Sequence, residues 1–301
     1  MIEVKKTVFL RVFHLIFEAY LNSAGIFAQH TAKSVGPQNI FRPRVVAPGS
    51  KDHIYWLALV AFSDRRTNST VLYRNFAKMF NRNPTLFRRG VYPSLRRMTQ
   101  LFRAYRIALP IKEISFFIER KRHLDEIFEG DPLKIYEDTV DVVSLMKKLK
   151  NVAKKNGIKN LFPGSKEKIF CLLAMFLREF VDLRFADVVP IDVWVQAISA
   201  STEVLTGEGF ITSSPLERIL RPSMTEIFEA YRSVEGAANA TWILGKFGCT
   251  HCGRIDMSSS CPVYHLCKGP FERMRHPASG KHFGAIQLPP KYKPKYSNQK
   301  D

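Results

Sequence analysis

The fold is decided by the stretch Asn160-Leu161-Phe162-Pro163-Gly164-Ser165-Lys166-Glu167-Lys168. Its Pro-Gly turn stands directly before a run of apolar residues at helical spacing, from Ile169 to Phe176. The first backbone N–H groups of a helix have no acceptor inside the helix, and the helix dipole adds positive potential at the same end. We therefore expect this hairpin to bind a phosphate group.

The stretch resembles the helix-hairpin-helix of the DNA glycosylase superfamily, which reads Leu-Pro-Gly-x-Gly-x-Lys before a similar apolar helix. Pro163 and Gly164 match this pattern, whereas Lys166 replaces its second glycine. The resemblance implies that the hairpin, with Ser165 and Lys166, holds the DNA backbone, and that Lys168 is the catalytic lysine of the bifunctional members. A rival register assigns Lys166 instead. An exposed lysine at a helix start is the plain structural alternative.

A second element of the same family follows in the run Val188-Val189-Pro190-Ile191-Asp192-Val193-Trp194-Val195. It resembles the Val-Pro-x-Asp element of the superfamily, in which the aspartate supports base excision. The resemblance assigns that role to Asp192, with Asp187 as the less favoured alternative. An aspartate before an apolar helix is also a good N-cap, so we expect Asp192 to begin a helix.

Upstream, the helix expected from Trp56 ends in Phe62-Ser63-Asp64-Arg65-Arg66-Thr67-Asn68. This resembles the first barrel helix of the endonuclease III group, which ends in Leu-Ser-x-Gln-x-Thr-Asp. Ser63 and Thr67 match, and Arg65 takes the place of the glutamine that fills the gap left by a flipped base. An ordinary amphipathic helix with a polar end is the alternative.

The charge of the chain points to an anionic partner. The 301 residues carry a formal net charge of +19, and the segment from Arg65 to Lys112 contains no Asp or Glu but twelve Lys and Arg. Aromatic residues are interspersed among them. Such a segment favours phosphate contacts, and we expect Arg96 and Arg97 to take part; a solvated helix face is the alternative. Double-stranded DNA with a damaged base is the expected partner.

A membrane surface is the second candidate partner for so basic a chain. The most apolar N-terminal stretch, from Thr7 to Phe27, is interrupted by Arg11, His14 and Glu18. It lacks the uninterrupted run of a spanning helix, and no signal-peptide cleavage pattern follows it. We expect no membrane association, and instead an intracellular, cytoplasmic and nucleoid-associated protein, as a monomer.

Four of the five cysteines form a loop with the spacing Cys-x2-Cys-x8-Cys-x5-Cys, namely Cys249, Cys252, Cys261 and Cys267. Four thiolates in one short segment can enclose a zinc ion or a 4Fe–4S cluster. The endonuclease III group carries a 4Fe–4S cluster in a C-terminal loop, usually spaced Cys-x6-Cys-x2-Cys-x5-Cys. The final interval matches, so the resemblance implies a 4Fe–4S cluster, with zinc as the alternative. Cys171 lies alone in an apolar helix.

Together these elements predict an all-α, two-lobed helix-hairpin-helix glycosylase fold. Residues 50–185 are expected to form a helical barrel that includes the hairpin, and residues 1–49 and 186–267 a second lobe with the iron–sulfur loop. Residues 268–301 are expected to be a disordered basic tail. Near the end of the second lobe, the pattern predicts separate helices over Pro215–Leu220 and Met224–Lys246.

The resemblance implies a base-excision repair enzyme with glycosylase and AP lyase activity. Such an enzyme flips a damaged base out of the duplex, and an oxidised purine is one candidate. The lysine then attacks the sugar and forms a Schiff base. Two alternatives stay open: a non-catalytic nucleic-acid-binding module on the same scaffold, and a nucleosidase that acts on RNA or free nucleosides.

Overall fold

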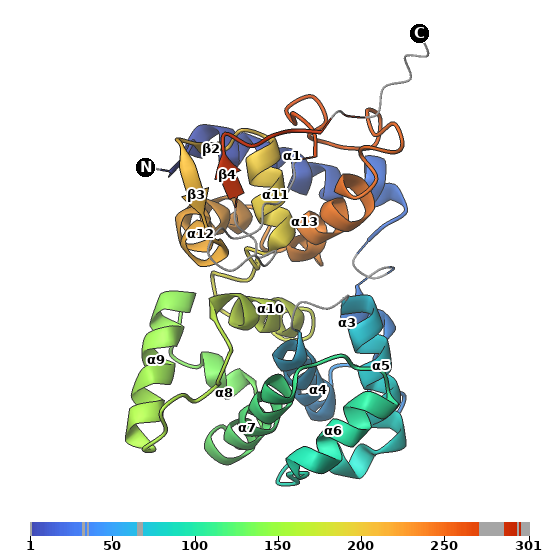
Figure 1. Cartoon of the computed structure of the whole chain (residues 1–301), viewed down its shortest axis with the longest axis vertical. Helices are drawn as coiled ribbons and strands as arrows, with labels where there is room; N and C mark the ends of the chain where they lie inside the picture. The colour runs from blue at the N-terminus through green and yellow to red at the C-terminus, as the bar shows by residue number, and fades with distance from the viewer. Residues whose placement is uncertain are drawn as a thin grey trace. The chain divides into compact units, whose positions relative to one another are not determined.

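Helices dominate the computed structural model, which describes residues 2–31, 34, 36–64, 69–270, 286–293 and 295. Contacts divide the chain into Pro37–Val188, here called the central unit, and Met1–Gly36 with Val189–Asp301, here called the terminal unit (Figure 1). The predominance of helix agrees with the all-α prediction. Residues 37–49, expected with the second lobe, belong instead to the central unit.

The central unit is built around one helix that is apolar on all sides. Its elements are α3 (Pro37–Ile40), α4 (Lys51–Ser63), α5 (Ser69–Arg82), the 3-10 turn η2 (Pro84–Phe87), α6 (Leu95–Ala104), α7 (Ile111–Ile127), α8 (Leu133–Tyr136), α9 (Val142–Lys155) and α10 (Glu167–Leu177). Every residue of α4 from His53 to Ser63 is buried, as expected for a helix with no polar face. Both α7 and α10 pack on α4, α6 packs on α7, and α9 packs on α10.

Local capping explains where the central helix begins. The side chain of Ser50 accepts a hydrogen bond from the backbone N–H of His53 at 3.2 Å. Such a cap stabilises a helix by about 1 kcal/mol.

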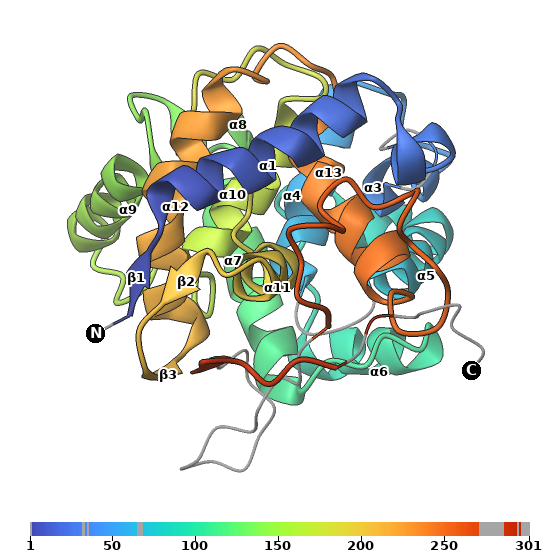
Figure 2. The same ribbon diagram turned by 90° about the horizontal axis from the view of Figure 1, so that it is seen from above.

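The terminal unit is made of two chain segments, Met1–Gly36 and Val189–Asp301. Its elements are β1 (Glu3–Val4), α1 (Lys6–Leu21), the 3-10 turn η1 (Gly25–Ala28), α11 (Val193–Ser201), β2 (Leu205–Thr206), β3 (Gly209–Ile211), α12 (Ser213–Glu229), the 3-10 turn η3 (Ala237–Asn239), α13 (Ala240–Ile243), the π-helix η4 (Leu244–Cys249) and β4 (Ile286–Leu288). In this unit α1 packs on α12 and α13, as Figure 2 shows. β1 pairs antiparallel with β2, and β3 with β4.

Two expectations about the terminal unit are wrong. First, α12 runs unbroken through Pro222 to Glu229, where we expected a break and then a helix as far as Lys246. Pro222 is exposed, so water can serve the carbonyl that its ring leaves without a donor. Second, part of the expected tail belongs to the fold: among its described residues, Ile286–Leu288 forms β4. Ile286 and Leu288 are buried and pair with β3, because their side chains supply apolar surface that the lysine-rich composition concealed.

No helix among the described residues is both long enough and apolar enough to cross a membrane.

Candidate functional site

The predicted hairpin is present in the central unit as a closed turn. The backbone N–H of Ser165 donates to the carbonyl of Phe162 at 3.0 Å, and Gly164 has a φ of +74°. This left-handed conformation favours glycine. A Cβ atom at position 164 would also lie 2.8 Å from Nη2 of Arg120. Both observations explain why the turn requires Gly164.

The departure from the family pattern at Lys166 does not disturb this turn. Lys166 is the N-cap of α10 and has φ −119° and ψ 175°, which is extended backbone open to any residue. A glycine at this position is therefore unnecessary for the hairpin. The side chain of Lys166 is exposed.

Lys168 is the second residue of α10 and is half-buried. It follows the hairpin directly, at the end of the helix where backbone N–H groups lack acceptors within the helix. The next residues, from Ile169 to Leu177, are all buried, which fixes the start of α10 against the core. The hairpin and Lys168 are thus neighbours in the chain, at the end of a helix that is packed into the core of the central unit.

Arg120 is a residue at the hairpin that the sequence did not point to. It lies on α7 and is buried, with its Nε donating to the Pro163 carbonyl at 2.6 Å and its Nη1 to the Phe62 carbonyl at 2.5 Å. Nη2 pairs with Glu113 at 3.1 Å. Arg120 therefore joins the hairpin to the end of α4. Its position three residues after Phe117, on the apolar face of α7, was the available signal.

A second buried cation on α7 anchors a loop of the basic segment. Lys121 Nζ lies 2.8 Å from an oxygen of Asp125 and donates to the Arg88 carbonyl at 2.9 Å. Asp125 also accepts the N–H of Gly90 at 2.9 Å and the hydroxyl of Tyr55 at 2.6 Å. Burial lowers the pKa of Lys121, against the effect of Asp125. These contacts tie the loop that carries Arg88 to α7.

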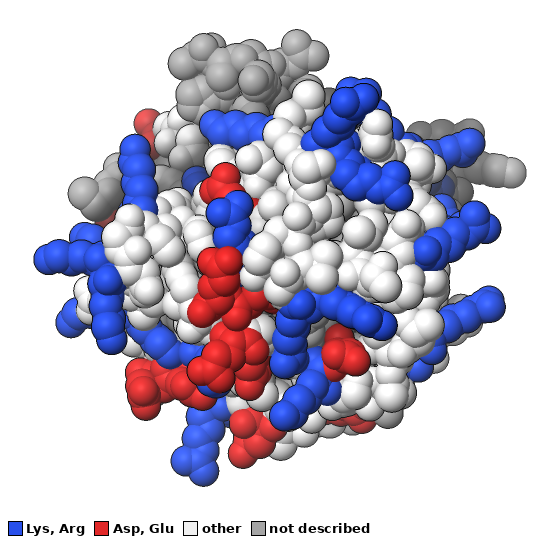
Figure 3. All heavy atoms as spheres, turned by 90° about the horizontal axis from the view of Figure 1, so that it is seen from below, with Lys and Arg blue, Asp and Glu red and all other residues white. Residues whose placement is uncertain are grey.

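The basic segment presents its charges to solvent. Every Lys and Arg from Arg74 to Lys112 is exposed, including Arg96 and Arg97 in the first turn of α6. Arg65 lies outside the described residues. The face in Figure 3 carries Lys and Arg around much of its margin and a group of Asp and Glu on one side, so basic charge there is abundant but not uniform.

Asp192 belongs to the terminal unit, where it is the N-cap of α11 as expected. Its Oδ1 accepts the backbone N–H groups of Trp194 at 2.8 Å and Val195 at 3.1 Å. The alternative, Asp187, is buried in the central unit and accepts the N–H of Val142 at 2.8 Å. Asp187 thus has a structural task at the start of α9.

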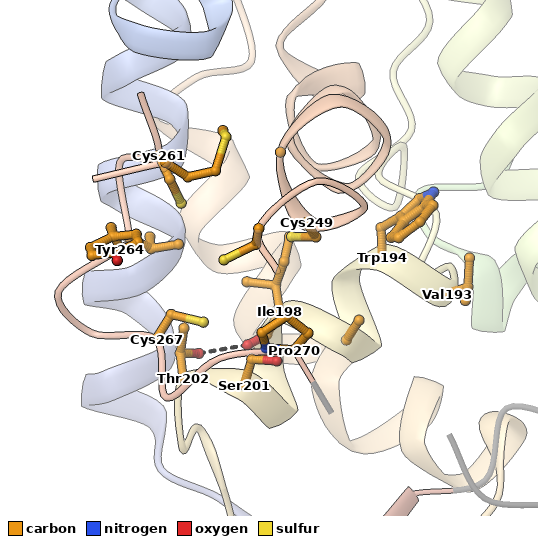
Figure 4. Close-up of a pocket in the computed structure, with 15 residues that line it drawn as sticks. Val193, Trp194, Ile198, Ser201, Thr202, Cys249, Cys261, Tyr264, Cys267 and Pro270 are labelled. Atoms are coloured by element: carbon orange, nitrogen blue, oxygen red, sulfur yellow. Dashed lines mark hydrogen bonds between the residues drawn. The ribbon is translucent and has the colours of Figure 1, made fainter. Parts of the chain in front are cut away.

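The four cysteines of the loop line one cavity of the terminal unit, of about 370 Å³. Figure 4 shows the sulfurs of Cys249, Cys261 and Cys267 directed toward the same space, and Cys252 completes the set. The other lining residues are mainly apolar and come from α11 and the loop: Val193, Trp194, Ala197, Ile198, Met257 and Val263. Among the described residues, no three His, Cys, Asp or Glu lie in an arrangement that would hold a single metal ion.

The cysteine cavity is a place where uncompensated negative charge is unfavourable. Burial raises the pKa of Cys261 to about 11 and raises that of Cys252 and Cys267. Burial and then the other three cysteines raise the pKa of Cys249. Backbone N–H groups act in the opposite sense: that of Gly269 donates to Cys267 Sγ at 3.3 Å. A bound cation is what normally stabilises thiolates in such surroundings.

The site residues predicted from sequence fall in both units of the chain. The hairpin, Lys166 and Lys168 lie together in the central unit, and Asp192 and the four cysteines lie in the terminal unit. Comparison with family models, with curated proteins and with solved structures finds no match for this chain.

Proposed function

We propose that this protein is a base-excision DNA glycosylase with AP lyase activity, with the two-lobed fold of the helix-hairpin-helix superfamily. One observation carries the proposal. The Pro163–Gly164 turn is closed, and buried Arg120 donates to its Pro163 carbonyl. The turn leads directly into a buried helix whose second residue is Lys168. A helix start of this kind can bind a phosphate, and Lys168 stands in its first turn, which supports the proposal.

The proposed chemistry assigns one step to each of these groups. The hairpin backbone and the exposed arginines bind phosphates and position the duplex. The lone pair of Lys168 Nζ forms a bond to C1′ of the flipped nucleotide while the glycosidic bond breaks, its electrons leaving with the base. Opening of the sugar yields a Schiff base, from which loss of a C2′ proton expels the 3′ phosphate. Asp192 supports the first step because a carboxylate stabilises positive charge that develops on the sugar.

A 4Fe–4S cluster is the cofactor that we propose for the cysteine cavity. Three observations support such a group: four thiols line one cavity, its walls are mostly apolar, and a backbone N–H donates to Cys267 Sγ. Among the described residues the thiols do not stand in an arrangement that would hold a single metal ion, so the support rests on the shared cavity. When bound, the cluster would cross-link four chain positions and provide a redox centre. Zinc is the alternative metal for the same thiols; the thiols would have to move closer together to bind one ion, since no three of them hold that arrangement in the described residues.

Activity on defined substrates tests the proposed reaction. The full-length protein, incubated with a panel of duplexes that each carry one lesion, should release the damaged base and nick the strand, and an undamaged duplex is the control. Binding to every duplex without base release on any of them would support the non-catalytic module. Release only from RNA or free nucleosides would support the nucleosidase.

Metal analysis tests the cofactor separately. Protein prepared without oxygen should be brown and should contain iron and acid-labile sulfide in equal amounts. One zinc per chain without iron would reject the cluster and leave the proposed reaction standing, because no step of that reaction is assigned to the cluster.

A further inference from the structure

The end of the described chain returns to the cysteine cavity. Residues 286–293 and 295, here called the C-terminal strap, begin as strand β4 on β3. Beyond the strand, the Tyr292 hydroxyl donates to the Ala200 carbonyl at 3.2 Å, and the Lys293 N–H donates to the Pro270 carbonyl at 2.6 Å. Pro270 lines the cavity, and Ala200 directly precedes Ser201, which also lines it.

The strap packs closely on the residue that holds the last cysteine. Gly269 donates its N–H to Cys267 Sγ and has a φ of +121°. A Cβ atom on Gly269 would lie 2.5 Å from the carbonyl oxygen of Lys293. Only glycine lets the strap and the cysteine loop approach to this distance. The strap is therefore in direct contact with the residue whose N–H donates to the Cys267 sulfur.

One side chain of the strap brings a positive charge to this place. Lys295 Nζ donates to the Tyr264 carbonyl at 2.6 Å and lies 4.2 Å from the centre of the Tyr264 ring. Tyr264 lines the cavity between Cys261 and Cys267.

A cluster bound by four thiolates has a net negative charge, and burying such a charge is unfavourable without a compensating group. A cation at a fixed position beside the cluster also stabilises an added electron. We propose that Lys295 is the charge partner of the cysteine site. Its side chain holds the C-terminal strap on the cysteine loop, and its positive charge raises the reduction potential of the cluster. This inference rests on the proposed 4Fe–4S cofactor.

Redox titration of the full-length protein, followed by visible absorption and EPR, tests the proposal. Lys295→Gln should shift the midpoint potential to a more negative value, because the reduced cluster loses a nearby positive charge. Lys295→Arg keeps the charge and should retain most of the potential. Lys291→Gln is the matched control, since Lys291 is an exposed lysine of the same strap.

A second readout uses cluster loss instead of potential. Lys295→Gln should release iron to a chelator several-fold faster than the wild type, whereas Lys291→Gln should not. Equal potentials and equal release rates in Lys295→Gln and wild type would overturn the inference while the cluster stands. A wild-type protein without iron would instead overturn the cofactor proposal, and the inference with it.

Discussion

Asp192 caps α11, and we propose that the same carboxylate also acts in base excision. Both hydrogen bonds that begin α11 go to the same carboxylate oxygen, Oδ1. The amide oxygen of an asparagine can accept the same two bonds but carries no charge. Substitution by Asn therefore separates the proposed electrostatic role from the cap, and substitution by Ala removes both.

We expect Asp192→Asn to keep the stability of the protein and to slow base release. Its unfolding free energy should change by at most about 0.5 kcal/mol, whereas Asp192→Ala should lose about 1 kcal/mol with the cap. On a pre-formed abasic site Asp192→Asn should still react, because the base has already gone. Single-turnover base release and urea unfolding give the two quantities. Undiminished base release by Asp192→Asn would remove this residue from the reaction.

At the scale of elements, the hairpin is held in place by a residue of another helix, α7. Arg120 on α7 donates to the carbonyls of Pro163 in the hairpin and Phe62 at the end of α4. Three segments that are distant in the sequence thus meet at one buried guanidinium. A lysine cannot reproduce this geometry, since its ammonium cannot span acceptors in two directions as a planar fork does.

Arg120→Lys should therefore lower the unfolding free energy by about 1–3 kcal/mol, because a buried carbonyl loses its donor. Reaction at an abasic site should fall more than stability alone explains, since the hairpin loses its support. Arg122→Lys is the control: Arg122 is an exposed residue of the same helix, and its effect should stay within about 0.5 kcal/mol. Thermal unfolding and abasic-site cleavage are the measurements. Wild-type values of both in Arg120→Lys would show that the hairpin stands without this contact.

The sequence indicated the elements whose cause is local. Helical periodicity, the Ser50 cap, the Asp192 cap and the Pro-Gly turn all depend on neighbouring residues. The contacts made by Arg120 and the pairing of β4 with β3 depend on residues far away in the chain, so no local pattern announces them. The continuity of α12 through Pro222 has the same origin, because packing of its apolar face outweighs the penalty of one proline.

At the scale of the whole molecule, the net charge of +19 is the property on which the proposed binding of nucleic acid depends. Arg96 and Arg97 are exposed in the first turn of α6, where they can reach phosphates. Each phosphate contact contributes about −0.9 to the slope of log K against log salt. The roles of these arginines are thus measurable without knowledge of the lesion.

Replacing Arg96 and Arg97 together with Gln should flatten that slope by about 1.8 on undamaged duplex, if each contacts one phosphate. Lys154→Gln with Lys155→Gln, two exposed residues of α9, is the matched control and should leave the slope unchanged. Fluorescence anisotropy over a series of salt concentrations measures both. A flatter slope in the control and not in the arginine pair would move the DNA interface to α9.

Borohydride trapping on a duplex with an abasic site tests the central claim most directly, because reduction makes the Schiff base permanent and peptide mapping then identifies the lysine. We predict that the wild type and Lys166→Gln are trapped, that the cross-link maps to Lys168, and that Lys168→Gln is not trapped but binds the duplex nearly as well as the wild type. Trapping that is lost in Lys166→Gln and kept in Lys168→Gln would shift the catalytic register by two residues. Trapping in neither the wild type nor any variant would contradict the catalytic account.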